Sequence, residues 1–459
     1  MFRKLERANS LGRGLGASLS LLLLGACAST QTKRHDALAS ELRRAAPRSA
    51  SSSAQLDLAG ASRLDRATFV HAVLEQNPSL ESARQGWRAA LAEHAQESAL
   101  DDPMLEYSFA PLSIGSNDVH FGQVITLSQK LPWPGKRALA GEVALAEAEA
   151  ARDDYQATRL HLALMASILF DQYYAVTRSL ELNEEHRILV EDIKRAAEAQ
   201  YETGRGSQQE PLQAEVELAH VVHDRIVLDA RRAVVVAQMN GLLHRAPETP
   251  LPPPPEELDL PDVGLGSSAS LQDQALSRRP ELKARRSDLR GREAARDLAE
   301  RASYPDFGVM ASYNSMWAMP EHQWMLGVSL NIPIQLGKRR GAVEEAEARI
   351  AQVRAQILGA SDEIRVEVEK ARQRLIEAEH VVRLYRERLL PAARAQIDVA
   401  RSGYVTGHSG FQALIDAERS LRTVELNYQE ALASLGERRA ELVRTVGRIP
   451  GQSPERRTP

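Results

Sequence analysis

The 459-residue chain contains a single cysteine, and aromatic residues make up only 5% of it. One cysteine excludes a disulfide framework within the chain and any metal centre that needs several thiolates. The formal net charge of -4 is small for this length, so the overall charge does not favour nucleic acid as a partner. Few aromatic residues, together with abundant Ala, Glu, Arg and Leu, indicate long helices rather than a thick globular core.

The single cysteine, Cys27, follows a basic start and a short apolar run over 15–26. A run of about a dozen apolar residues is too short to cross a bilayer as a helix but has the length found in signal peptides. The sequence Leu-Gly-Ala-Cys over 24–27 resembles the bacterial lipobox, in which the cysteine is acylated and becomes the first residue of the mature protein. We therefore expect a lipoprotein signal peptide over 1–26. The stretch 27–64 is polar and rich in Ser and Ala, which predicts an acylated, flexible tether.

The chain contains two copies of one unit, because matching segments recur at an almost constant offset of 202 or 203 residues. Three pairs of anchor residues keep this offset: Pro78 and Pro280, Lys136 and Lys338, and Gly204 and Gly407. The first repeat is expected over 65–246 and the second over 269–448. A Pro-rich crossover over 247–268 joins them and should be stiff and extended, and a disordered tail is expected over 449–459.

Each copy predicts the same order of elements, namely a helix, two short strands, a very long helix, a tight Thr-Gly turn and a second helix. In the first copy the elements are expected over 67–99, 104–112, 119–131, 137–202 and 208–244. In the second copy they are expected over 269–302, 306–317, 322–333, 339–404 and 411–447. The second long helix has apolar residues at alternating spacings of three and four from Val343 to Leu389, with one extra four-residue step between Ile364 and Val368. This is a coiled-coil pattern with a local change in winding, so the long helix must lie against other helices.

The strand expected over 322–333 is apolar on one face, while the residues of its other face are small, polar or Met. The apolar face consists of Trp324, Leu326, Val328, Leu330 and Ile332. This alternation is typical of a membrane β-barrel strand, and a half-buried strand of a soluble sandwich has the same pattern. Four strands cannot close on themselves, and open edges are not tolerated in lipid. A membrane location therefore requires several chains to share one barrel.

The doubled plan, with Leu-Pro-Trp-Pro-Gly-Lys-Arg (131–137) opening the first long helix, resembles the outer-membrane efflux protein family, the TolC family. The resemblance covers essentially all of residues 65–447. It implies a mostly α fold with a small membrane β component, in which a homotrimer shares a twelve-stranded outer-membrane barrel and a periplasmic helical tunnel. It also implies a passive exit duct of a Gram-negative bacterium that docks to a periplasmic adaptor and serves an inner-membrane resistance-nodulation-division pump. The heptapeptide resembles the branch that exports heavy-metal cations of the cobalt–zinc–cadmium type.

By this resemblance, each Pro/Gly-basic element lies where a barrel strand becomes a tunnel helix. In the first copy the prolines end the strand ladder, the glycine permits the bend, and headgroups or solvent take the charge of the lysine. In the second copy the prolines are reduced to Pro333, so its glycine alone should keep this geometry. The junction residues are Pro132, Pro134, Gly135, Lys136, Gly337 and Lys338.

The resemblance places the turns after the two long helices at the periplasmic end of the tunnel, where an adaptor docks. The tip residues expected to make this contact are Gly204, Arg205, Leu212, Gly407, His408 and Leu414. Asp416 falls at a position where the family narrows its entrance with acidic rings, although the companion acid is Ala413 here. Glu210 falls where the family has an acid that holds the tip closed, but Ser409 occupies the place of its usual Arg partner.

No nucleophile–base pair stands out, so we expect no enzyme activity, no cofactor and no resident metal. His220 and His223 form a helical pair without an evident third ligand. A periplasmic adaptor also has a long helical hairpin, but it would need Gly-rich lipoyl halves, which this chain lacks. A structural coiled-coil lipoprotein would not need the four amphipathic strands. Within the efflux hypothesis, a drug-efflux or type I protein-secretion duct is an alternative, because the tunnel itself need not be selective for its cargo.

Overall fold

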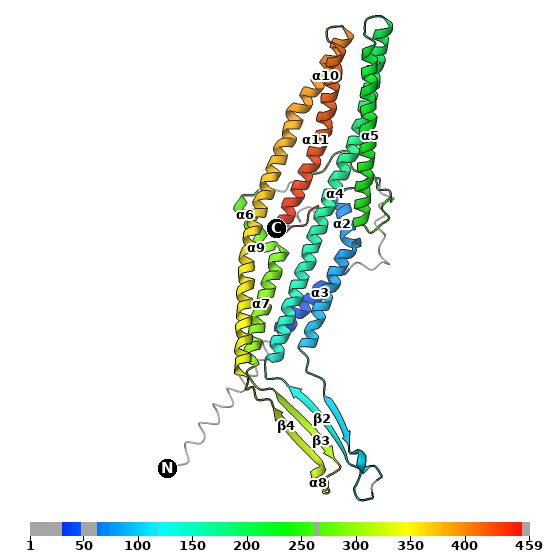
Figure 1. Cartoon of the computed structure of the whole chain (residues 1–459). Helices are drawn as coiled ribbons and strands as arrows, with labels where there is room; N and C mark the ends of the chain where they lie inside the picture. The colour runs from blue at the N-terminus through cyan, green and yellow to red at the C-terminus, as the bar shows by residue number, and fades with distance from the viewer. Residues whose placement is uncertain (1–29, 47–61, 116, 261–265, 452–459) are drawn as a thin grey trace. The chain divides into compact units, whose positions relative to one another are not determined.

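The computed structural model describes residues 30–46, 62–115, 117–260 and 266–451 (Figure 1). Cys27 and the expected signal peptide therefore lie outside the described residues. The chain divides into two compact units, and both long helical stretches contribute residues to each of them. The described parts of unit 1 are 30–46, 83–115, 117–155 and 281–360, and those of unit 2 are 62–82, 156–260, 266–280 and 361–451.

The two repeats contain the same order of main elements, as the sequence predicts. The first consists of α2 (Arg66–Gln76), α3 (Pro78–Glu97), β1 (Met104–Phe109), η1 (Pro111–Ser113), β2 (Gln123–Leu131), α4 (Lys136–Glu202) and α5 (Gln209–Leu242). The second consists of α6 (Ser268–Arg278), α7 (Pro280–Arg301), β3 (Phe307–Asn314), α8 (Pro320–Gln323), β4 (Trp324–Leu330), α9 (Leu336–Leu384), η2 (Tyr385–Leu389), α10 (Leu390–Val405) and α11 (Phe411–Thr445). The expected mostly helical fold with four strands is confirmed.

Two helices that the sequence predicts as continuous are each split before a proline. Asn77 separates α2 from α3, and Arg279 separates α6 from α7. Both residues have extended backbone, with ψ of 122° and 124°. A proline ring disfavours helical conformation in the residue before it, whereas the proline itself fits the first turn of the next helix. The expectation of single helices over 67–99 and 269–302 is therefore wrong at these two positions.

The second long helix contains a wide turn that the sequence pattern does not locate. Residues 385–389 are π-helical, and the N–H of Leu390 bonds to the carbonyl of Tyr385, five residues earlier. Pro391 lies directly after this turn and has no N–H to donate, so the wide turn accommodates a break in the regular bonding. The apolar seam still faces inward, since Val368 and Leu375 are buried. Within the described ranges, no helix is both long and apolar enough to span a bilayer.

The four strands form one antiparallel sheet in the order β1-β2-β3-β4, so β2 and β3 join the two repeats. The register collects apolar side chains on one face. Aligned rows on this face are Tyr107, Ile125, Tyr313 and Trp324, then Leu105, Leu127, Ala311 and Leu326, and finally Leu131, Phe307 and Leu330. Leu326 is 91% exposed and Val328 is 76% exposed. The predicted alternation is confirmed, and its apolar face is uncovered in the described part of the chain.

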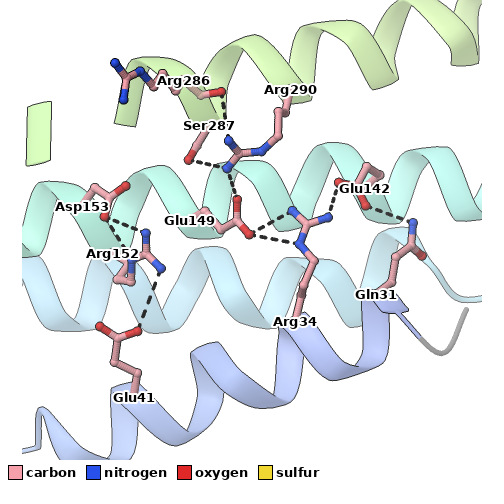
Figure 2. Close-up of polar contacts among 10 residues, drawn as sticks. All are labelled: Gln31, Arg34, Glu41, Glu142, Glu149, Arg152, Asp153, Arg286, Ser287 and Arg290. Carbon is pink, nitrogen blue, oxygen red and sulfur yellow. Dashed lines mark hydrogen bonds and ion pairs between the residues drawn. The ribbon is translucent and has the colours of Figure 1, made fainter. Parts of the chain in front are cut away.

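Residues 30–44 form a helix, although the sequence analysis expects a flexible tether over 27–64. Figure 2 shows how this helix is held: the guanidinium of Arg34 bonds to Glu142 and Glu149 on α4. Glu149 also pairs with Arg290 of α7, so one carboxylate joins three helices. The expectation is wrong for this stretch, because the polar side chains that indicated disorder make ion pairs with α4.

The Pro-rich crossover is hydrogen-bonded to α4 within unit 2. The hydroxyls of Tyr173 and Tyr174 donate to the carbonyls of Pro252 and Glu256 at 3.1 and 3.2 Å. These bonds satisfy carbonyls that an extended, proline-rich backbone cannot pair within itself.

Candidate functional site

The two turns at the ends of the long helices have the same geometry. Gly204 and Gly407 both have positive φ, of +67° and +75°, a conformation that glycine adopts without strain. In the first turn the carbonyl of Gln200 accepts the N–H groups five and six residues later. The carbonyl of Gly403 does the same in the second turn. The sequence prediction of two equivalent glycine-capped turns is confirmed.

Most of the tip residues predicted from the sequence are exposed, but one is not. Arg205 and His408 are exposed, and Leu212 is 61% exposed. Leu414 is only 2% exposed and packs in an apolar cluster with Phe411 and neighbouring residues. The expectation that Leu414 contacts an adaptor is therefore wrong. The side chain lies on the inner face of α11, where the two helical hairpins pack together.

Glu210 has a partner in the second hairpin, although the arginine expected there is Ser409. The Tyr404 hydroxyl on α10 donates a hydrogen bond of 2.7 Å to Oε2 of Glu210 on α5. Burial and this hydrogen bond to Glu210 raise the pKa of Tyr404, so the hydroxyl stays protonated and keeps donating. The Ser409 hydroxyl bonds instead to the carbonyl of Ala400 at 3.2 Å. The structure thus connects the hairpins through a tyrosine that the sequence analysis did not single out.

Asp416 lies on the exposed side of α11, with its side chain 57% exposed. One of its oxygens accepts a hydrogen bond of 2.9 Å from Gln412 and lies 4.0 Å from the guanidinium of Arg419. The carboxylate is therefore accessible to solvent.

A chain of charged side chains, most of them buried, connects four helices of unit 2. We call it the charge chain; its members are Arg394 on α10, His186 on α4, Glu217 on α5, and Glu418, Arg419, Arg422 and Glu425 on α11. The His186 ring contacts Glu418 through Nδ1 and Glu425 through Nε2, both at 3.1 Å. Arg394 bonds to Glu425 at 3.0 Å. Since both ring nitrogens face carboxylates, the doubly protonated imidazolium fits this position.

The charge chain continues from Glu418 to the first hairpin. Arg422 lies 3.8 Å from Glu418 and bonds to Glu217 at 2.6 Å. Arg419 bonds to the other oxygen of Glu217, also at 2.6 Å. Glu217 is completely buried, so its carboxylate depends on these two arginines.

The pKa shifts agree with this pairing. Burial lowers the pKa of His186, but the hydrogen bonds to Glu418 and Glu425 outweigh burial and raise it above its ordinary value. Burial raises the pKa of Glu217, but the bonds to Arg419 and Arg422 outweigh burial and lower it. Both groups therefore favour their charged forms. His186 and Glu217 could not be identified from the sequence, because their partners are distant along the chain.

The strand-to-helix junctions differ from the sequence expectation in two respects. Gly135 has φ of +92° and makes the bend, as expected, but Lys136 is not left to headgroups or solvent. Its Nζ lies 2.8 Å from Asp306, with both side chains largely buried. In the second copy Gly337 lies in the first turn of α9 and is not among the described glycines with positive φ. The expectation that this glycine makes the second bend is therefore wrong.

The fold defines a class of protein in which two tandem repeats each join a β-hairpin to a long helical hairpin. The sequence profile of the outer membrane efflux protein family matches residues 271–448. The second repeat is therefore similar to that family, which is the one that the sequence resemblance names. No curated protein has a significant sequence match to the chain.

Solved outer-membrane channels have the same fold over most of the chain. The channel OprN is 19% identical with a TM-score of 0.69, covering 85% of this chain and 95% of OprN. CusC is 18% identical with a TM-score of 0.72, covering 83% and 92%. The open state of the MtrE channel of Neisseria gonorrhoeae is 19% identical with a TM-score of 0.67, covering 84% and 91%. The fold shared with these channels thus includes the first repeat as well.

Proposed function

We propose that this protein is the outer-membrane channel of a tripartite efflux system, a passive exit duct serving a resistance-nodulation-division pump. The observation that carries the proposal is the four-stranded sheet, which has an apolar, uncovered face and two unpaired edges in β1 and β4. Lipid cannot satisfy the backbone groups of an open edge, so the edges must pair with other copies of the chain. Three copies provide a twelve-stranded barrel.

The helices also support a homotrimer. One side of α5 exposes a row of large apolar side chains that no described element covers. The row consists of Val216, Val222, Ile226, Val227 and Val234, with exposed fractions from 46% to 65%. A neighbouring copy would bury this surface and remove it from water. The same contact would close a tunnel of helices below the barrel.

The position of the N-terminal helix supports a lipid anchor at Cys27. Gln31, near the start of this helix, donates to the carboxylate of Glu142 on α4 (Figure 2). It also donates to the carbonyl of Ala138, in the first turn of α4. Cys27 precedes Gln31 by four residues, which span about 14 Å at most when extended. An acyl chain on Cys27 would therefore reach the inner surface of the outer membrane of a Gram-negative cell.

The tips are proposed to dock a periplasmic adaptor through the exposed Arg205, Leu212 and His408, together with the glycine turns. In a trimer, three copies of Asp416 would surround the entrance, repel anions and favour cations. The cargo is proposed to be heavy-metal cations, and a drug-efflux or protein-secretion duct is the alternative. Unchanged tolerance of a deletion strain to zinc, cadmium, cobalt, copper and silver would exclude the metal version.

The proposal is tested by electron microscopy and single-channel conductance of the mature protein extracted in detergent. We expect a threefold-symmetric tube that conducts cations, and Asp416→Ala should lower its preference for cations. Glu202→Ala removes another exposed acid at the tip and serves as the control, because Glu202 ends α4 rather than following the second turn. A soluble, monomeric and non-conducting rod would overturn the proposal.

Tyr404→Phe should increase the resting conductance of the same channel. The substitution keeps the ring beside Phe411, 5.6 Å away between centroids, but removes the hydroxyl that bonds to Glu210. A hydrogen bond to a charged group contributes about 1.5–3 kcal/mol, which is enough to shift the closed population by roughly tenfold or more.

Tyr201→Phe is the matched control, since Tyr201 holds the corresponding place in the first repeat and is 46% exposed. Equal resting conductance of Tyr404→Phe and wild type would mean that the Tyr404–Glu210 bond does not hold the tip.

A further inference from the structure

The two strand-to-helix junctions use their matching lysines differently. Lys136 is held within the protein, because its Nζ bonds to Asp306 at 2.8 Å and to the carbonyl of Tyr304 at 2.9 Å. Its side chain is only 13% exposed. Lys338 occupies the same place in the second repeat, but it is exposed, and no described residue bonds to it. One junction thus neutralises its lysine internally, whereas the other presents a free ammonium group.

The apolar row of β4 continues past the end of the sheet toward this lysine. The last paired residue is Leu330, opposite Phe307. At the next two alternate positions, Ile332 and Ile334 are 74% and 79% exposed. The surface that faces lipid along the strand therefore extends beyond the strand, up to the start of α9.

An aromatic cluster marks the membrane surface near the end of the sheet. Trp133 stacks on Tyr304 and on Phe307, with ring centroids 5.2 and 5.6 Å apart. Aromatic side chains of this kind gather at the level of lipid headgroups. Because Phe307 is opposite Leu330, the cluster places the headgroup region at the end of β4 and over the segment that follows it. Lys338 lies eight residues further along the chain, on the periplasmic side.

A groove combines the apolar extension with the free lysine. It has a volume of about 360 Å³, and its lining residues are Ala302, Ile332, Ile334, Gln335, Lys338, Arg339 and Ala342. No acidic side chain lines it. Arg339 is held in place by the carbonyls of Ala302 and Gln335, at 2.9 and 3.1 Å. The groove therefore offers two cations beside an apolar surface.

The neighbouring groove has a different character. It contains Arg340 and shares Arg339 with the first groove, but Glu300, Glu344 and Glu347 also line it. Three carboxylates would repel an anionic group, so the two grooves at the start of α9 provide an internal comparison.

We propose that the groove of Lys338 and Arg339 binds a phospholipid of the inner leaflet of the outer membrane. The phosphate would lie between the ammonium and guanidinium groups, and an acyl chain would lie along Ile332 and Ile334. The inference rests on the proposed function, since it requires the strands to be in a membrane. An anionic headgroup should bind better than a zwitterionic one, whose own cation would be repelled.

The test uses the full-length mature trimer in detergent, with phosphatidylglycerol as the probe and phosphatidylcholine of the same acyl chains for comparison. Native mass spectrometry measures the lipid retained by each trimer. Phosphatidylglycerol should be retained in preference, and Lys338→Ala should weaken its binding about fivefold, the effect expected of one basic residue at a membrane surface. Arg340→Ala, in the acidic groove, should leave binding unchanged.

Equal binding by Lys338→Ala and wild type would overturn the inference. It would also be overturned if Lys338→Ala dissociated the trimer without changing lipid retention, because the groove would then be an interface between copies. Electron microscopy of the wild type distinguishes a failure of the lipid-site proposal from a failure of the proposed function. If a barrel forms but shows no preference for phosphatidylglycerol, only the lipid site is excluded. If no barrel forms, the proposed function is excluded as well.

Discussion

Glu217→Ala is expected to lower the free energy of unfolding of unit 2 by about 3–5 kcal/mol, the usual loss when one partner of a buried ion pair is removed. Glu217 is completely buried and accepts hydrogen bonds of 2.6 Å from both Arg419 and Arg422. Without it, Arg422, whose side chain is only 11% exposed, would keep a charge that has lost its nearest carboxylate. The loss of stability arises from the unpaired buried charge of Arg422 rather than from the two missing hydrogen bonds.

Glu215→Ala is the matched control, because Glu215 lies two residues earlier on α5 and pairs with Lys194 on the surface. Its side chain is 58% exposed, and exposed pairs contribute only about 0–1 kcal/mol. Urea unfolding followed by circular dichroism in detergent compares the two variants with wild type. If both variants unfold at the same urea concentration, the charge chain does not stabilise the packing of the two hairpins.

Features encoded by short stretches of sequence could be predicted well. The glycines of the two tip turns could be identified because a helix that ends in positive φ needs glycine, and Gly204 and Gly407 both adopt it. The alternation of β4 predicted one apolar face, which the register confirms. The constant offset between the repeats predicted the order of the elements.

Features that depend on distant packing could not be predicted. His186 is 232 and 239 residues from its partners Glu418 and Glu425, and a histidine on a long helix gives no sign of such neighbours. Leu414 was assigned to an exposed tip from its distance to the turn, but burial depends on which face meets the other hairpin. The helix over 30–44 was missed because polar composition indicates disorder unless charged partners, here Glu142 and Glu149, are known to lie nearby.

Asp171 on α4 is the second group for which we expect a large effect. It is completely buried and pairs with Arg66 of α2, while its other oxygen has no hydrogen-bond partner among the described residues. Gly436 of α11 lies against this carboxyl, and a Cβ at that position would collide with it. Burial raises the pKa of Asp171 from its ordinary value of 3.8 to about 7, although Arg66 partly offsets burial.

The pH dependence follows from this shift. Between about pH 4 and pH 7 the folded protein holds a proton on Asp171 that the unfolded chain has already released. Its contribution to stability is therefore complete below about pH 4, falls as the pH rises, and is lost above about pH 7. One pKa unit corresponds to about 1.4 kcal/mol, so the loss between pH 5 and pH 8 should be about 3 kcal/mol.

Asp171→Asn should remove this part of the pH dependence, because the amide has the same shape as the carboxyl and does not titrate in this range. Unfolding free energies measured at pH 5 and pH 8 should therefore differ by about 3 kcal/mol less in the variant than in wild type. Asp192→Asn provides the control, since Asp192 lies on the same helix with a side chain that is 40% exposed, and its pH dependence should follow wild type. If Asp171→Asn also followed wild type, Asp171 would be ionised in the folded protein throughout this range, and its pair with Arg66 would outweigh burial.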